Sequence, residues 1–188
     1  MKMNKKNVRI LLILGLALVI LAMGPPLSQP AAQGEVFLDV PFVKQPKNLC
    51  GAASLSMVWR YWDRELGLGN VLPLSEIAKV ISPRPSEGAL GSEMRRYFES
   101  KGFHAFAFRG SRIDLETHVA RGRPLIVSLK RGSSSHYVVV VGQDFERGIV
   151  LVNDPDEKKL LELSLTSFES EWAAAHWWTL LAVPEKKD

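Results

Sequence analysis

Residues 45–62 read QPKNLCGAASLSMVWRYW, a polar loop that runs into an apolar-striped segment. The large and small apolar side chains after Cys50 recur at helical spacing and fall on one face, namely Ala52, Leu55, Val58, Trp59 and Trp62. This pattern predicts a helix that begins near Cys50 and ends near Trp62.

Cys50 is the only cysteine in the sequence, and it lies at the predicted start of this helix. Unpaired backbone N–H groups and the positive end of the helix dipole favour a thiolate at such a position. The amide of Gln45, a short way upstream, can lie beside the sulfur and donate to a developing oxyanion. The stretch fits a nucleophile with an oxyanion donor, and it fits equally a small buried hydrophobic residue that happens to be cysteine.

The first 24 residues have the pattern of an export signal. Residues 1–9 carry four basic side chains, and residues 10–23 form a continuous apolar stretch. A stretch of about 14 residues matches a signal peptide and is short of the roughly 20 residues that span a bilayer. Residues 25–35 have the composition of a linker. We therefore expect residues 1–24 to be a signal peptide or an uncleaved anchor in the cytoplasmic membrane, and the protein to be periplasmic or extracellular.

The basic character of the chain comes from that leader. The sequence holds 24 basic and 20 acidic residues, a formal net charge of +4, so the four basic residues of the leader account for the excess. No basic patch with interleaved aromatic residues follows, and we expect no nucleic-acid partner. The histidines are dispersed without ligand spacing (His104, His118, His136 and His176). We therefore expect neither a metal site nor a cofactor.

Residues 36–184 have the pattern of one α+β domain, because predicted helices come mainly first and predicted strands mainly last. Besides the helix at 50–62, we expect helices at 75–80, 92–101, 113–121 and 168–172. We expect strands at 36–40, 103–108, 124–129, 136–141, 149–152, 160–163 and 177–183, with a flexible polar loop at 131–135.

Two residues at the ends of neighbouring predicted strands could act as proton partners of a thiol. His136 opens the strand 136–141, and strand alternation places it on one face with Val138 and Val140. Asp154 follows the next strand, and antiparallel pairing would bring its carboxylate level with His136, where it could accept the Nδ1 proton. A structural histidine at a strand end and an ordinary Asn-Asp-Pro turn are the alternatives.

Together the four residues supply the groups needed for thiol acyl transfer. Cys50 would attack a carbonyl carbon as a thiolate, and His136 would share its proton and donate it to the leaving amine. Asp154 would orient the imidazole. The Gln45 amide and the Cys50 backbone N–H would face the oxyanion, a donor of this kind being worth roughly 3–4 kcal/mol of barrier.

The motifs Gln45–x4–Cys50-Gly51-Ala52-Ala53, His136-Tyr137-Val138 and Asn153-Asp154-Pro155 resemble the C39-like branch of papain-type cysteine peptidases, relatives of bacteriocin-processing peptidases. The resemblance covers about residues 36–183. It implies a papain-like fold, in which a helical half packs on an antiparallel sheet, with a Cys–His–Asp triad and a glutamine oxyanion donor. All four functional positions are matched here.

Well-known members of that family trim leader peptides as cytosolic domains of ABC exporters, whereas this chain carries an export signal. We therefore expect an exported cysteine peptidase with an envelope or extracellular peptide or protein as its substrate. Two alternatives stay open: an acyl transferase or amidase that acts on cell-envelope material with the same triad, and a non-catalytic peptide-binding module.

Overall fold

The computed structural model describes residues 36–67, 69–70, 72–82 and 88–185. The predicted signal or anchor at 1–24 and the linker at 25–35 lie outside the described residues. No described helix is both long enough and apolar enough to cross a membrane. All of the described residues belong to one compact unit of the chain.

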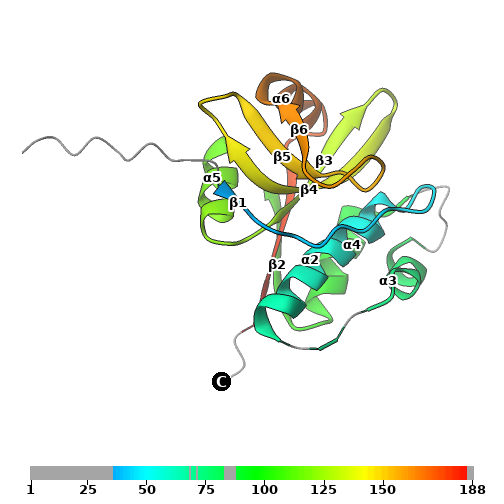
Figure 1. Ribbon diagram of the computed structural model, residues 1–188. Helices are drawn as coiled ribbons and strands as arrows, with labels where there is room; N and C mark the ends of the chain where they lie inside the picture. The colour runs from blue at the N-terminus through cyan, green and yellow to red at the C-terminus, as the bar shows by residue number, and fades with distance from the viewer. Residues whose placement is uncertain (1–35, 68, 71, 83–87, 186–188) are drawn as a thin grey trace, which may run out of the picture. The chain divides into compact units, whose positions relative to one another are not determined.

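The described chain is an α+β fold with an antiparallel sheet, as the order of elements predicted (Figure 1). Its helices are α2 (Cys50–Leu66), α3 (Leu74–Ile81), α4 (Gly91–Glu99), α5 (Arg112–Ala120) and α6 (Leu165–Ala174). Its strands are β1 (Val36–Phe37), β2 (Phe103–Arg109), β3 (Leu125–Arg131), β4 (Ser134–Asp144), β5 (Ile149–Asn153), β6 (Leu161–Ser164) and β7 (Trp178–Pro184).

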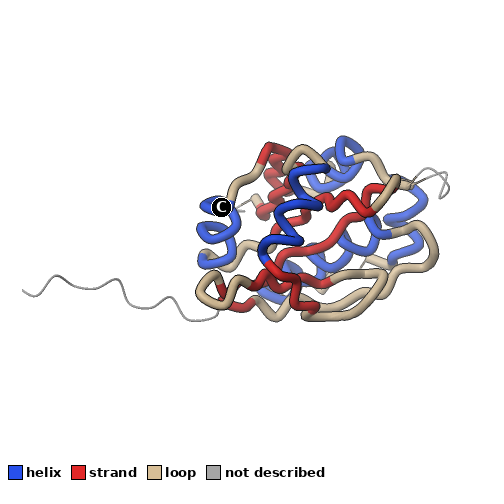
Figure 2. The backbone as a smooth tube through the Cα atoms, turned by 90° about the horizontal axis from the view of Figure 1, so that it is seen from above, coloured by secondary structure: helices blue, strands red, loops and turns tan. Residues whose placement is uncertain are grey.

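The sheet has the strand order β2-β7-β3-β4-β5-β6, and the short β1 pairs with β4 outside this path. All of these pairings are antiparallel. Helices α2, α3 and α4 gather on one side of the strands and α6 lies on the other (Figure 1), and the tube view shows helices on more than one side of the strands (Figure 2).

Two apolar clusters cover the two faces of the sheet. On β4, Val139 and Val141 belong to the cluster that includes the buried face of α2, whereas Val138 and Val140 belong to the cluster with Phe168 and Trp172 of α6. This confirms the alternation expected from the sequence. The central strand is therefore buried on both faces, which fixes its register and the position of its first residues.

Several element boundaries differ from the sequence prediction. Helix α2 continues to Leu66 and ends where Gly67 adopts a left-handed φ of 62°. The segment 131–135, predicted as a flexible loop, is a tight hairpin in which Arg131 pairs with Ser134. Only Gly132 and Ser133 lie outside the ladder, and Gly132 has a φ of 59°. The long ladder between β3 and β4 therefore carries His136 on a regular strand.

Candidate active site

Cys50 is the first residue of α2, at the helix end that faces the sheet. The residue before it, Leu49, offers no side-chain cap, and the first turn of the helix holds no acidic residue. Among the described residues the N–H groups of this turn therefore have no side-chain acceptor at the cap, and they keep their positive potential near the sulfur. The Ser54 hydroxyl, one turn further on, donates to the Tyr137 carbonyl at 3.2 Å and joins the helix to β4.

Gly51 lets this helix end approach the neighbouring segment closely. A Cβ atom at position 51 would lie 2.6 Å from the Cβ of Ala89 and 3.4 Å from the Tyr137 ring. Tyr137 in turn packs edge-on against Trp178, with ring centroids 5.3 Å apart. The glycine after the cysteine is thus required by packing, since a side chain there would push apart the elements that surround the thiol.

His136 lies near the start of β4, where the ladder pairs it with Leu129 of β3. Its Nε2 lies 2.7 Å from Oδ1 of Asp154, whose side chain is fully buried at 0% exposure. The sequence-based prediction that Asp154 would bind Nδ1 is wrong, because the ring presents Nε2 to the carboxylate. A carboxylate accepts only, so Nε2 carries the proton and Nδ1 is left for the thiol.

Asp154 follows β5, and the antiparallel register of β4 and β5 sets its position, with Val139 opposite Asn153. Asn153 anchors the strand end by donating to the Val40 carbonyl at 3.0 Å and accepting from the Leu160 amide at 3.0 Å. His136 and Asp154 are therefore neighbours, as predicted. They meet because the start of β4 and the end of β5 lie at the same edge of the sheet.

Arg131, which the sequence pattern predicts in a loop, is the second side chain that bonds the buried carboxylate. Its Nη1 donates to Oδ2 of Asp154 at 2.8 Å, and its Nε donates to Oε2 of Glu171 at 3.2 Å. The signal that could have revealed it is the two-residue Gly132-Ser133 turn, which makes Arg131 the last residue of β3 rather than part of a loop.

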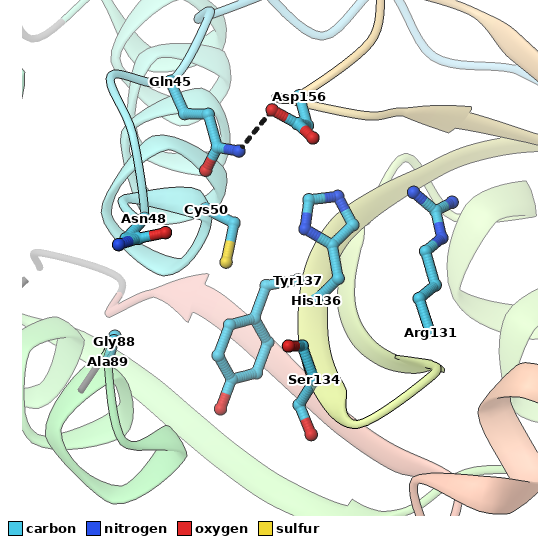
Figure 3. Close-up of a pocket in the computed structure, with 11 residues that line it drawn as sticks. Gln45, Asn48, Cys50, Gly88, Ala89, Arg131, Ser134, His136, Tyr137 and Asp156 are labelled. Atoms are coloured by element: carbon cyan, nitrogen blue, oxygen red, sulfur yellow. Dashed lines mark hydrogen bonds between the residues drawn. The ribbon is translucent and has the colours of Figure 1, made fainter. Parts of the chain in front are cut away.

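Gln45 lies on the opposite wall from His136, in the segment that leads into α2 (Figure 3). Its backbone N–H donates to the Pro155 carbonyl at 2.9 Å, and its Nε2 donates to Oδ1 of Asp156 at 2.8 Å. Its Oε1 is buried and has no hydrogen-bond partner among the described residues. Asp156, like Arg131, was not singled out from the sequence.

Gln45, Cys50 and His136 line one open cavity of about 540 Å³. Figure 3 shows the sulfur of Cys50 and the ring of His136 facing one another across it. The remaining walls are mostly small or polar and are contributed by Asn48, Gly88, Ala89, Arg131, Ser134, Ser135, Tyr137 and Asp156. Asp154 lies behind His136, buried beneath the wall. The structure thus brings together all four residues singled out in the sequence.

The electrostatics of the cavity favour a charged pair. Burial opposes ionisation of the Cys50 thiol, but the hydrogen bond and charge of His136, with backbone groups of Tyr137 and Gly51, outweigh it and lower the pKa of the thiol below its ordinary value. Burial likewise opposes the imidazolium, but the hydrogen bonds and charges of Asp154 and Cys50 raise the pKa of His136 to about 9. Both shifts favour a thiolate paired with an imidazolium over the neutral pair.

Asp154 stays ionised beside this pair. Burial raises the pKa of its carboxyl, but His136, the Asp156 amide and Arg131 outweigh burial and lower that pKa to about 2. The arrangement of thiolate, imidazolium and carboxylate is the one that acyl transfer to sulfur needs. Among the described residues no group of three His, Cys, Asp or Glu side chains is placed to hold a metal ion.

Residues 37–177 match the model of the Peptidase_C39 like family. The chain is 30% identical over 136 residues to the transport/processing ATP-binding protein ComA of Streptococcus pneumoniae. That alignment covers 72% of this chain and 17% of ComA, so the chain spans about a sixth of the curated relative it matches.

Two solved structures share the fold. The peptidase domain of Streptococcus ComA, described as a bifunctional ABC transporter of a quorum-sensing pathway, superposes with a TM-score of 0.62 at 20% identity, over 78% of this chain and 98% of that one. A double glycine motif protease from an AMS/PCAT transporter, solved with its leader peptide, gives a TM-score of 0.61 at 19% identity, over 79% and 94% of the two chains.

Proposed function

The chain belongs to the C39-like family of cysteine peptidases, and from that premise we propose that it hydrolyses peptide bonds with Cys50 as nucleophile and His136 as its proton partner. The observation that carries the proposal is the His136 ring, which bonds a buried carboxylate through Nε2 and faces the only cysteine across one cavity.

The proposed reaction begins with the thiolate. Sγ of Cys50 attacks the carbonyl carbon of the scissile bond, and the electron pair of the C=O bond moves onto the oxygen. The Cys50 backbone N–H and the Gln45 amide donate to that oxyanion. One N–H of the Gln45 amide is directed to Asp156, and the second remains for the oxyanion.

His136 then transfers its proton to the leaving nitrogen, so that the C–N bond breaks and an acyl-enzyme thioester remains. In the second half, His136 takes a proton from water as the water oxygen attacks the thioester, and the thiolate leaves. Asp154 acts on the ring rather than on the substrate: it holds Nε2 and stabilises the imidazolium that is present before the first proton transfer and again after the second.

We propose a peptide or protein substrate in the cell envelope or outside the cell, reached through export directed by residues 1–24. A fusion of residues 1–35 to a reporter enzyme that folds only outside the cytoplasm tests this in a bacterial host. Reporter activity in the periplasm or medium is the expected result. A second fusion joins the same segment to a reporter that is active only in the cytoplasm. If only this second reporter is active, the export proposal is refuted, and the peptidase proposal is unaffected.

The peptidase proposal is tested by turnover of a peptide panel, with products identified by mass spectrometry. The panel includes double-glycine leader peptides, because the solved relative was bound to a leader peptide. We expect cleavage by the wild type and at least about 1000-fold slower cleavage by Cys50→Ser and His136→Ala. Products in which an added amine replaces water would instead assign acyl transfer, and peptide binding without turnover would assign a binding module.

A further inference from the structure

The turn that follows Asp154 is fastened to the segment that carries Gln45. The Gln45 N–H donates to the Pro155 carbonyl at 2.9 Å, and Nζ of Lys44 donates to the Glu157 carbonyl at 3.0 Å and to the Asp156 carbonyl. The segment before α2 and the turn after β5 are therefore held side by side by contacts that do not involve the side chain at position 156.

Asp156 makes a different contact through each of its two parts. Its backbone N–H donates to Oδ1 of Asp154 at 2.9 Å, the same oxygen that faces His136. Its side chain accepts from Nε2 of Gln45 at 2.8 Å. One residue thus contacts both the buried carboxylate behind the imidazole and the amide on the opposite wall of the cavity.

The carboxylate of Asp156 determines which end of the Gln45 amide faces it. A carboxylate only accepts hydrogen bonds, so it selects the nitrogen and repels Oε1. Oε1 is accordingly turned into a buried position where it has no described partner. No other described hydrogen bond holds the side chain of Gln45, and Figure 3 shows its amide nitrogen directed at Asp156.

We propose that Asp156 is a positioning residue for the oxyanion donor: it holds the Gln45 amide with its nitrogen toward the cavity, so that the second N–H is ready for the oxyanion. This inference rests on the proposed function, in which Gln45 is that donor. Without Asp156 the amide could rotate and place Oε1, an acceptor, where negative charge develops in the transition state. The residue would then act on turnover and only weakly on substrate binding.

The test is a double-mutant cycle between Gln45→Ala and Asp156→Ala, with kcat and KM measured on the peptide that the wild type cleaves best. We expect Gln45→Ala to lower kcat by about 100- to 1000-fold. Asp156→Ala should lower kcat by about 10- to 100-fold with KM changed less than about 3-fold. The double variant should be no slower than Gln45→Ala, because Asp156 has no role once the amide is gone.

Two further variants separate positioning from a merely structural effect. Asp156→Asn keeps an oxygen acceptor and the backbone contact to Asp154, and should restore most of the kcat lost in Asp156→Ala. Glu146→Ala, which removes an exposed acid from the turn between β4 and β5, should match the wild type. Alkylation of Cys50 forms no oxyanion, so its rate should be the same in wild type and Asp156→Ala. An unchanged alkylation rate also shows that the variant has folded with its active site intact.

Each contrary result has its own meaning. Unchanged turnover in Gln45→Ala would remove the donor from the proposed mechanism and overturn this inference with it. A loss in Gln45→Ala with no loss in Asp156→Ala would overturn the inference alone. Independent, multiplying losses in the double variant, or a change mainly in KM, would show that Asp156 acts apart from Gln45 and would also overturn it.

Discussion

Arg131 gives the buried carboxylate of Asp154 a permanent counter-charge. The Asp154 side chain is 0% exposed and that of Arg131 is 30% exposed, with 2.8 Å between Nη1 and Oδ2. His136 can lose its proton during a reaction, whereas a guanidinium stays charged. The carboxylate therefore keeps one cationic partner in every protonation state of the imidazole. Removing that partner would leave a buried charge with less compensation.

We predict that Arg131→Gln lowers the free energy of unfolding by about 1–3 kcal/mol, the range for a lost hydrogen bond to a buried charged group. Urea unfolding at neutral pH measures this. The matched control is Arg112→Gln, because Arg112 pairs with Glu169 at the surface with a 55% exposed side chain, where solvent screens the pair and it contributes little. Equal, small losses in both variants would show that Arg131 makes no special contribution.

The lowered pKa of Asp154 predicts a pH dependence of stability. Its carboxyl titrates at about 2 in the folded chain against an ordinary value of 3.8. Because the folded pKa is the lower one, the stabilisation is present above about pH 4 and is lost as the pH falls through about 2. Relative to Asp154→Asn, the wild type should lose about 2 kcal/mol of unfolding free energy between pH 5 and pH 2. A constant difference over that range would contradict the prediction.

The sequence singled out Cys50, His136 and Asp154 because each lies at the end of a recognisable element, and ends of elements gather at one edge of a sheet. Neither Arg131 nor Asp156 lies at the end of a predicted element, and only the Gly132-Ser133 turn points to Arg131. Their positions depend on the hairpin that Arg131 closes and on the fastening of the turn after β5 to the segment before α2. The prediction from the sequence also assigned Asp154 to the wrong ring nitrogen, because a rotamer of His136 cannot be read from strand spacing.

At the scale of elements, the first turn of α2 packs closely against the segment at Ala89, against α4 and against β4. Gly51 is buried, and its missing side chain leaves room for Ala89, Met94 of α4 and Tyr137 of β4. The clash that a Cβ would make with Ala89 is with another Cβ, which moves only if the backbone moves. The position of the thiol relative to β4 therefore depends on the absence of one methyl group.

We predict that Gly51→Ala destabilises the fold by about 1–3 kcal/mol, the usual effect of overpacking a core, and slows turnover by displacing Cys50. The second variant, Ala89→Gly in the Gly51→Ala background, removes the Cβ atom that lies 2.6 Å away and should recover part of both losses. Thermal unfolding and peptide cleavage measure the two effects. Independent losses, with no recovery in the double variant, would count against the packing argument.

Helices and strands followed the sequence pattern better than their ends did. Ser111 caps α5 in a capping box with Asp114, just before the predicted helix at 113–121. Ser75 and Ser92 do not cap α3 and α4, because those helices already begin at Leu74 and Gly91 after extended residues Pro73 and Leu90. Apolar periodicity reports which residues are buried, whereas a helix start depends on the backbone angles of a single residue.

At the scale of the whole molecule, the site exists only when two parts of the chain pack together. The thiol comes from α2, and its proton partner comes from β4, more than 80 positions later in the chain. The Ser54 hydroxyl of α2 donates to the Tyr137 carbonyl of β4 across a separation of 83 residues. The hydrogen bond from Gln45 to Asp156 likewise joins residues that are far apart in the sequence, with a separation of 111 residues. The chemistry of the thiol is thus a property of the assembled fold.

The alkylation rate of Cys50 by iodoacetamide, measured from pH 5 to pH 10 in wild type and His136→Ala, is the most direct test of a thiolate held by an imidazolium. At pH 6.5 an ordinary thiol with a pKa of 9.0 is only about 0.3% ionised. The wild type should react at least about 10-fold faster than His136→Ala at that pH, with a further change in rate where His136 titrates, at about 9. Equal rates in the two proteins, with a single inflection near the ordinary thiol pKa of 9.0, would contradict the ion pair.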